Sequence, residues 1–224
     1  SYSHGLEWAI EEGTVATVAD LEAWITDVLT EGAGRNDAIL LRAAHAAALE
    51  GDAARLAEIA TLAAAFQPTK ERRLEAVAQG NAFLDTVART WDGALGTDGV
   101  HGENGFSRPV AALAAEVALL MPAPAAWSYP VAVGLAAACH GVPVELTVKA
   151  YLQAFATNLI SAGVRAVPLG QTEGQRAIAR LAPVYAHIAD ATRDASLDDL
   201  GGAALLADIA SMLHETQYTR LFRS

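Results

Sequence analysis

Residues 129–141 have the sequence YPVAVGLAAACHG, and apolar side chains occupy every face of the helix that they would form. Gly141 suits the position after a helix C-terminus, and Pro143 suits the first turn of a following helix. A helix that is apolar all round is typically buried, whereas a surface helix has one polar face. The segment therefore predicts a central helix on which other helices pack.

The rest of the chain is also typical of helices. Alanine accounts for 51 of the 224 residues, and both Ala and Leu lose little side-chain entropy in a helix. Apolar residues recur at steps of three and four, and no alternating strand pattern of useful length occurs. We predict an all-α fold, a single-domain bundle over residues 1–224 with about nine or ten helices around the central apolar helix. The expected helices cover residues 20–31, 36–50, 52–66, 69–91, 107–121, 129–140, 143–160, 172–191 and 202–214.

Several helix ends can be placed from single residues. Asp20 and Asp52 are candidate N-caps, and residues 172–175 have the spacing of a capping box. Gly80 lies inside an expected helix at a cost of about 1 kcal/mol relative to Ala. It therefore predicts a close approach of two backbones. Residues 92–105 contain five glycines and form the longest expected loop.

Acidic residues outnumber basic ones, mostly near the N-terminus. The formal net charge is −11, of which −8 lies in residues 1–66. Excess negative charge argues against nucleic acid as the main ligand. One cysteine, Cys139, excludes an internal disulfide. Prolines and two glutamates interrupt the apolar span 110–148, so no segment reaches the roughly 18–20 apolar residues of a membrane helix. No signal peptide is visible, and we expect a cytoplasmic protein with no nucleic acid and no membrane as partners.

No motif in the sequence requires an enzyme. Its six histidines are at least 27 residues apart, so none forms a metal-binding pair on one helix. The sequence has no phosphate-binding GxxxxGK[ST] and no GxSxG motif. Cys139 and His140 are most simply core residues. We therefore predict no catalytic residues, no metal site and no cofactor. One alternative stays open: an all-α enzyme whose site combines scattered residues such as His4, Glu7 and Asp198.

The C-terminal segment, residues 215–224, has no helical stripe but combines arginines with aromatic and apolar side chains. This composition is typical of residues that anchor protein interfaces. The segment is either an interaction tail or a tail docked on its own domain. Its candidate partner-binding residues are Tyr218, Arg220, Leu221, Phe222 and Arg223.

Three motifs together resemble the urease accessory protein F (UreF) family. They are SHGLEW at residues 3–8, PLGQTEGQ at 168–175 and HETQYTRLFRS at 214–224. Each is weak alone, but the three in this order are specific. The segment TKERR at 69–73 and the apolar helix also fit, so the resemblance covers the whole chain. The family normally has a further segment before SHGLE, including a glycine-rich stretch. No counterpart of that segment precedes SHGLE in this sequence.

The resemblance implies an all-helical homodimer without catalytic activity. Family members bridge a D/H-type accessory protein to a G-type GTPase, and the assembly passes nickel into apo-urease in the cytoplasm. Nickel is then handled by the assembled complex and not held tightly by this chain. The tail residues given above would bind the D/H-type partner. Near the dimer or GTPase-facing surface, the resemblance places His4, Glu7, Arg165 and Gln171. A structural interaction protein unrelated to nickel is a further alternative, which the three motifs disfavour.

Overall fold

The computed structural model describes residues 4–92, 108–167 and 170–215. These residues form eleven α-helices and one short 3-10 helix, and they contain no strand. The prediction of an all-α fold is therefore confirmed. There are more helices than expected for two reasons. A short helix forms at Leu6–Glu11, and the helix expected over 172–191 is divided at Leu181, which ends one helix and precedes the next.

The chain divides into two compact units. Unit 1 comprises residues 1–38, 68–75 and 149–224, and unit 2 comprises residues 39–67 and 76–148. Three helices contribute residues to both units, so three of the four points at which the chain passes from one unit to the other lie within helices. They are α3 (Ala33–Glu50), α5 (Lys70–Thr90) and α8 (Val144–Ala166). The expectation of one domain over the whole chain stays a prediction.

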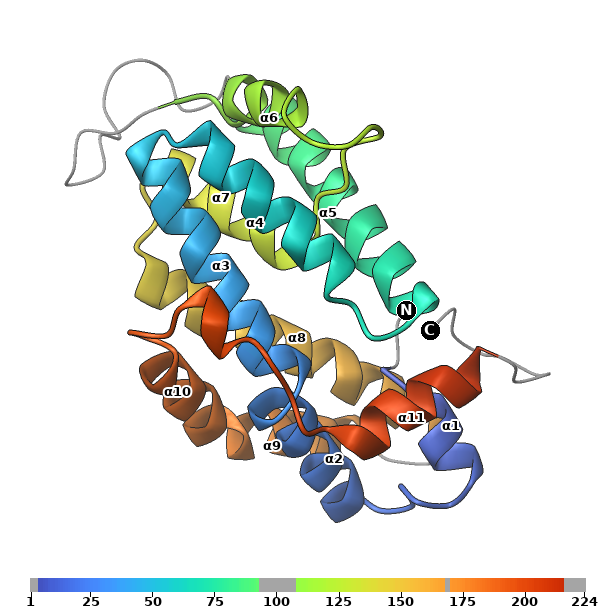
Figure 1. Ribbon diagram of the computed structural model, residues 1–224. Coiled ribbons are helices and arrows are strands. Elements are labelled where there is room, and N and C mark those ends of the chain that lie inside the picture. Colours follow the sequence, from blue (N-terminus) through green and yellow to red (C-terminus); the bar gives the residue numbers. More distant parts are fainter. Residues whose placement is uncertain (1–3, 93–107, 168–169, 216–224) are drawn as a thin grey trace. The chain divides into compact units, whose positions relative to one another are not determined.

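Unit 2 contains the apolar helix α7 (Tyr129–Cys139), in which nine of the eleven residues are buried. It packs with α4 (Ala53–Ala65) and α6 (Val110–Ala118), which also contact each other (Figure 1). A Cβ atom at Gly134 of α7 would lie 2.4 Å from the carbonyl oxygen of Leu41. Only a glycine allows α7 and α3 to approach so closely, so the apolar helix is buried on this face against backbone.

Gly80 confirms the close approach that the sequence predicts. A Cβ atom there would lie 2.0 Å from the carbonyl oxygen of Trp127, in the segment that leads into α7. The backbone of Trp127 is also held by the side chain of Asn81, whose Oδ1 accepts a hydrogen bond from Trp127 N at 3.2 Å. Adjacent residues of α5 thus fix the start of the apolar helix.

Unit 1 holds the helices near both ends of the described chain. Helix α1 packs on α11, and α2 packs on α9 and α10. Figure 1 shows α1 and α11 side by side. The helices that lie wholly in this unit are α1 (Leu6–Glu11), α2 (Val18–Thr30), α9 (Gln171–Arg180), α10 (Ala182–Ala191), the 3-10 helix η1 (Leu197–Asp199) and α11 (Leu205–His214).

The helix caps agree only in part with the sequence. Asp52 caps α4 as predicted, accepting a hydrogen bond from Arg55 N at 2.9 Å. Asp20 is not the N-cap of α2. Thr17 is, and Asp20 completes its capping box from the third helical position. The capping box expected at residues 172–175 does not form, because α9 already begins at Gln171 after Gly170. The spacing of residues 172–175 therefore placed the start of this helix one residue or more too late.

Candidate functional site: the base of the C-terminal segment

Helix α11 ends where the C-terminal motif begins, and it packs against the N-terminal motif. The backbone of His4 and Gly5 has positive φ angles of 51° and 75°. A Cβ atom at Gly5 would lie 2.7 Å from Ser211 N and 2.8 Å from the Cβ of Ala210. Glycine is therefore required at residue 5 both for its left-handed conformation and for the close approach to α11.

His214, the last residue of α11, is fully buried between two carboxylates. Its Nε2 lies 3.2 Å from Oε2 of Glu7 on α1, and its Nδ1 lies 3.0 Å from Oε2 of Glu71 on α5. We call Glu7, Glu71 and His214 the His214 cluster. The cluster connects the first helix, the start of α5 and the end of α11. Residues of the motifs SHGLEW, TKERR and HETQYTRLFRS thus meet at one place.

Further hydrogen bonds hold the same end of α11 to the start of α5. The hydroxyl groups of Thr69 and Ser211 are 3.2 Å apart. Glu71 N donates to Oε1 of Glu215, the residue after α11, at 3.2 Å. Thr69 Oγ1 accepts from Arg72 N at 3.2 Å, which ties the first turn of α5. These contacts and the His214 cluster fix the place from which the C-terminal segment departs.

A second layer of buried polar groups lies in unit 1. The hydroxyl of Tyr151 donates to Oδ2 of Asp37 at 2.7 Å. Burial raises the pKa of Asp37 to about 6, although the hydrogen bond from Tyr151 and the charge of Arg72 oppose the rise. Burial also lowers the pKa of His4 well below its usual value, and the charge of Arg72 adds to this effect. The His4 ring packs edge-on against Phe155, with centroids 4.7 Å apart. His4 is therefore a neutral core residue near pH 7.

The outer face of α11 is apolar and exposed. Its buried face carries the small or polar residues Ala210, Ser211 and His214. Among the described residues, the exposed fractions are 66% for Leu205, 68% for Leu206, 49% for Ile209 and 52% for Met212. These four lie at helical spacing on one side. Soluble proteins seldom leave such a contiguous group of large apolar side chains in water, so the face has the character of a protein-binding surface.

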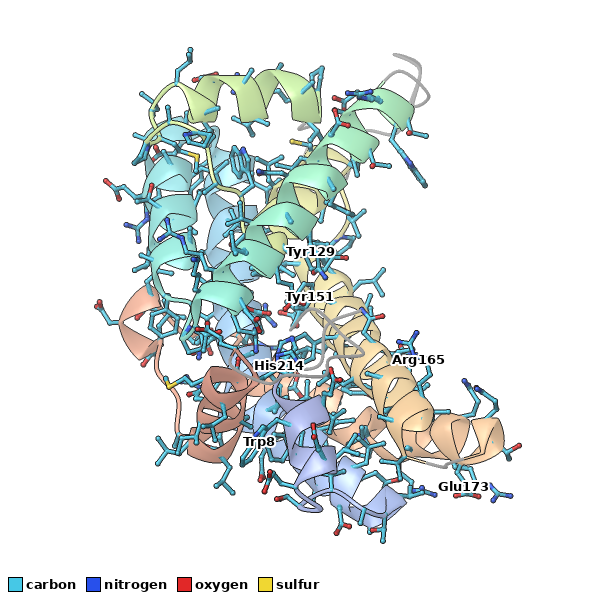
Figure 2. The ribbon with its side chains drawn as sticks, turned by 90° about the vertical axis from the view of Figure 1, so that its right-hand side faces the viewer. Trp8, Tyr129, Tyr151, Arg165, Glu173 and His214 are labelled. Atoms are coloured by element: carbon cyan, nitrogen blue, oxygen red, sulfur yellow. The ribbon has the colours of Figure 1, made fainter. Side chains whose placement is uncertain are left out.

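The predicted site residues fall into three groups. His4 and Glu7 are buried, so neither presents its side chain to a partner in this conformation. Arg165 at the end of α8 and Gln171 at the start of α9 are exposed. Figure 2 shows Arg165 pointing outward, whereas His214 lies among other side chains in the interior. The tail residues Tyr218, Arg220, Leu221, Phe222 and Arg223 lie outside the described residues. The assignment of partners to all these positions stays a prediction.

The alternative of an enzyme with a scattered site gains no support from these positions. Asp198 lies in η1 and is exposed, whereas His4 and Glu7 are buried. Within the described ranges, no three His, Cys, Asp or Glu side chains are placed to hold one metal ion. In the His214 cluster the two carboxylates bind opposite nitrogens of the ring and do not converge on a point. None of the helices described has the length and apolarity of a membrane span.

Sequence reasoning missed His214, Glu71, Thr69 and Ser211 as site residues. Their signal was present, because His214 begins the C-terminal motif and Thr69 and Glu71 belong to TKERR. No spacing rule connects such distant positions, since Glu7 and His214 are 207 residues apart. Parts of two of the three motifs, SHGLEW and HETQYTRLFRS, are in contact through Glu7 and His214.

Fold and site together define a class: an all-α protein in which a buried His–Glu cluster holds a C-terminal helix with an exposed apolar face. Comparison with known proteins gives the family of this chain. The family model described as UreF matches residues 15–182. The chain therefore belongs to the UreF family, as the motifs predicted.

Curated relatives support this membership over the whole chain. A protein named urease accessory protein UreF from Rhodopseudomonas palustris (strain HaA2) is 47% identical over 224 residues, which is 100% of this chain and 86% of the relative. The protein of the same name from Bradyrhizobium sp. (strain ORS 278) is 47% identical over 100% of this chain and 85% of its own. That from Xanthobacter autotrophicus (strain ATCC BAA-1158 / Py2) is 46% identical, with coverages of 100% and 84%.

Proposed function

We propose that this chain is a urease accessory protein that acts as a scaffold for nickel insertion, without catalytic activity of its own. It forms a homodimer in the cytoplasm and bridges a D/H-type accessory protein to a G-type GTPase. The assembly delivers nickel to apo-urease, and the ion is held by the complex and not tightly by this chain. Membership of the UreF family and the names of the curated relatives support the link to urease.

One observation supports the bridging role most directly, namely the exposed apolar face of α11. Leu205, Leu206, Ile209 and Met212 lie on the helix that leads directly into residues 215–224. Large apolar side chains beside an Arg- and aromatic-containing segment are typical of the central part of a protein interface. The helix face and the tail are contiguous in sequence, so we assign both to the D/H-type partner. Arg165 and Gln171, which are exposed elsewhere, are assigned to the dimer or to the GTPase.

The experiment is a binding assay with a D/H-type accessory protein from a urease-producing bacterium. Ile209→Asp and Met212→Asp place a charge on the exposed face without touching the buried one. Each is expected to weaken binding at least tenfold, because a charge at the centre of an interface is desolvated without a partner. The helical circular dichroism signal stays unchanged. Leu119→Asp is the matched control, since Leu119 lies in unit 2 and is 87% exposed.

A second variant separates the tail from the helix. Deletion of residues 218–224 is expected to abolish binding to the D/H-type protein and to leave the helical fold and the dimer intact. A truncated protein that unfolds would show instead that the tail is docked on its own domain. If all variants bind like the unmodified chain, the assignment of α11 and the tail to this partner is wrong.

The proposal that nickel is not held tightly by this chain is tested by equilibrium dialysis of the isolated protein. We expect no uptake of nickel at micromolar concentration. Stoichiometric uptake would contradict the proposal and would require ligands from residues outside the described ranges, or from two copies of the chain.

A further inference from the structure

The two hydrogen bonds of His214 determine how many protons the three side chains of the His214 cluster hold together. A neutral imidazole has one N–H donor and one acceptor nitrogen, whereas an ionised carboxylate only accepts. His214 has a carboxylate oxygen of Glu7 at one nitrogen and of Glu71 at the other. Both contacts are favourable only if the three side chains together hold one proton more than they hold when the ring is neutral and both carboxylates are ionised. Whether the ring or a carboxyl holds that proton does not change the count.

Loss of this proton makes one of the two contacts repulsive. The lone pair of a ring nitrogen then faces a carboxylate oxygen at about the distance of a hydrogen bond. His214 and Glu7 are buried and the Glu71 side chain is 17% exposed, so water replaces the lost interaction poorly and the penalty is larger than at a surface. The contact that breaks joins α11 either to α1 or to α5. The packing of α11 on α1 and α5 therefore depends on the protonation of the cluster.

The position of α11 matters for binding because the helix has two roles. It carries the exposed apolar face, and its last residue, His214, immediately precedes the C-terminal segment. Its buried side fits closely against Gly5, where a Cβ atom would lie 2.7 Å from Ser211 N. A shift of α11 would therefore move its exposed apolar face.

We propose that the Glu7–His214–Glu71 cluster is a proton-dependent clamp that positions α11 and the C-terminal segment for binding the D/H-type partner. This inference rests on the proposed function for its partner, but the clamp itself is a property of the isolated chain. Glu7, Glu71 and His214 are positioning residues and need not touch the partner. Binding is tightest when the cluster holds its additional proton, and it weakens as the pH rises.

Other ionisable groups in this core come from every element that packs near the cluster, and each can contribute to a pH profile. They are His4 next to α1, Asp37 on α3, Arg72 and Glu75 on α5, Tyr151 on α8, Asp208 on α11 and Glu215 after it. Burial keeps His4 neutral, and Asp37, with a pKa of about 6, is largely ionised above pH 7. All of them are unchanged in a variant of Glu71, so their contributions cancel when that variant is compared with the unmodified chain.

Glu71→Gln is the informative variant because an amide can donate as well as accept. A neutral His214 can then donate to Glu7 and accept from Gln at residue 71, so both contacts survive without the additional proton. In this variant the packing of α11 on α1 and α5 is expected to be independent of pH. At low pH it is expected to be as stable as in the unmodified chain. A residue with a merely structural role would not show this change of pH profile. Glu58→Gln is the matched control, since the Glu58 side chain is 70% exposed and lies on α4 in unit 2.

The first readout is hydrogen exchange of the α11 amides in the isolated, full-length chain between pH 6.5 and 9, corrected for intrinsic exchange. We expect the protection of residues 205–214 to fall about tenfold with rising pH in the unmodified chain and in Glu58→Gln. In Glu71→Gln we expect it to stay constant. A pH-independent protection of the unmodified chain, or the same fall in Glu71→Gln, would overturn the clamp.

The second readout is the affinity for the D/H-type protein over the same pH range. We expect the unmodified chain to bind about tenfold more weakly at pH 9 than at pH 6.5, and Glu71→Gln to bind equally at both. No binding at any pH would refute the proposed function, while the exchange experiment would still decide on the clamp. Binding with identical pH profiles in both proteins would refute the coupling of the clamp to the partner.

Discussion

Glu7 and His214 lie 207 residues apart in the sequence, yet their side chains are 3.2 Å apart in the buried core of unit 1. The contact joins the N-terminal SHGLEW motif to the first residue of the C-terminal HETQYTRLFRS motif. Glu71 lies at the other nitrogen of the ring, so the last residue of α11 is held to both α1 and α5. The outer face of the same helix is apolar and exposed. Firm anchoring on one side and exposure on the other are what a docking element needs.

Replacement of His214 by Ala is expected to destabilise the fold by about 3 kcal/mol, because the buried carboxylate of Glu7 and the partly buried carboxylate of Glu71 lose their shared partner. Urea unfolding at pH 7 measures the change. His187→Ala is the control, since His187 is exposed on α10 and its loss is expected to change stability by no more than about 0.5 kcal/mol. Equal stabilities of the two variants would show that the cluster contributes nothing to folding.

Gly5→Ala is expected to cost more stability than Gly13→Ala, although both glycines have a φ of 75°. At Gly13 a Cβ atom would meet nothing within 4 Å, so that variant reports only the strain of the left-handed backbone, about 1–2 kcal/mol. At Gly5 the methyl group would also collide with Ser211 and Ala210, which adds about 1–3 kcal/mol of overpacking. Thermal or urea unfolding of both variants gives the difference. Equal losses would contradict the close approach of α1 and α11.

Gly134→Ala tests the packing of the central apolar helix. A Cβ atom 2.4 Å from the carbonyl oxygen of Leu41 forces α7 away from α3, and we expect a loss of about 1–3 kcal/mol. Gly201→Ala is the control, because a Cβ atom there would meet nothing within 4 Å. A Gly134→Ala protein as stable as the control would show that α7 is not packed against backbone on this face.

Asp37→Asn tests the buried carboxyl through its pH dependence. Because its pKa is raised from 3.8 to about 6, the folded state binds a proton more tightly than the unfolded state. Asp37 therefore supports folding best below about pH 3.8, and this support is lost as the pH rises through about 6. An Asn side chain can still accept the hydrogen bond from Tyr151 but carries no charge.

We expect Asp37→Asn to match the unmodified chain near pH 3 and to exceed its free energy of unfolding by about 3 kcal/mol above pH 7. Chemical unfolding across pH 3–8 measures the difference, with Asp194→Asn, at an exposed residue, as the control. A constant difference across this range would contradict a raised pKa.

Features set by local sequence could be predicted. The apolar helix over residues 129–140 became α7 because no face of it could favour water, and Gly80 marked a close approach because a helix tolerates glycine poorly. Asp52 caps α4 because its side chain reaches the amide three residues on. The cap and the apolar helix depend on their own segments, whereas Gly80 indicated a close approach but not its partner, Trp127.

The candidate site could not be predicted in the same way, because its contacts depend on tertiary structure. His214 is the last residue of the helix expected over 202–214, and nothing in its neighbourhood shows that Glu7 and Glu71 lie against it. His4 and Glu7 were expected on a surface, but both are buried. Five large apolar residues of α11 are exposed, because Ala210, Ser211 and His214 form its buried face.

The scaffold role is tested most directly by co-purifying this chain with D/H-type and G-type accessory proteins and measuring the mass of the complex by size-exclusion chromatography with light scattering. We predict one stable assembly that contains both partners and two copies of this chain. A monomer that elutes apart from both partners would contradict the scaffold role.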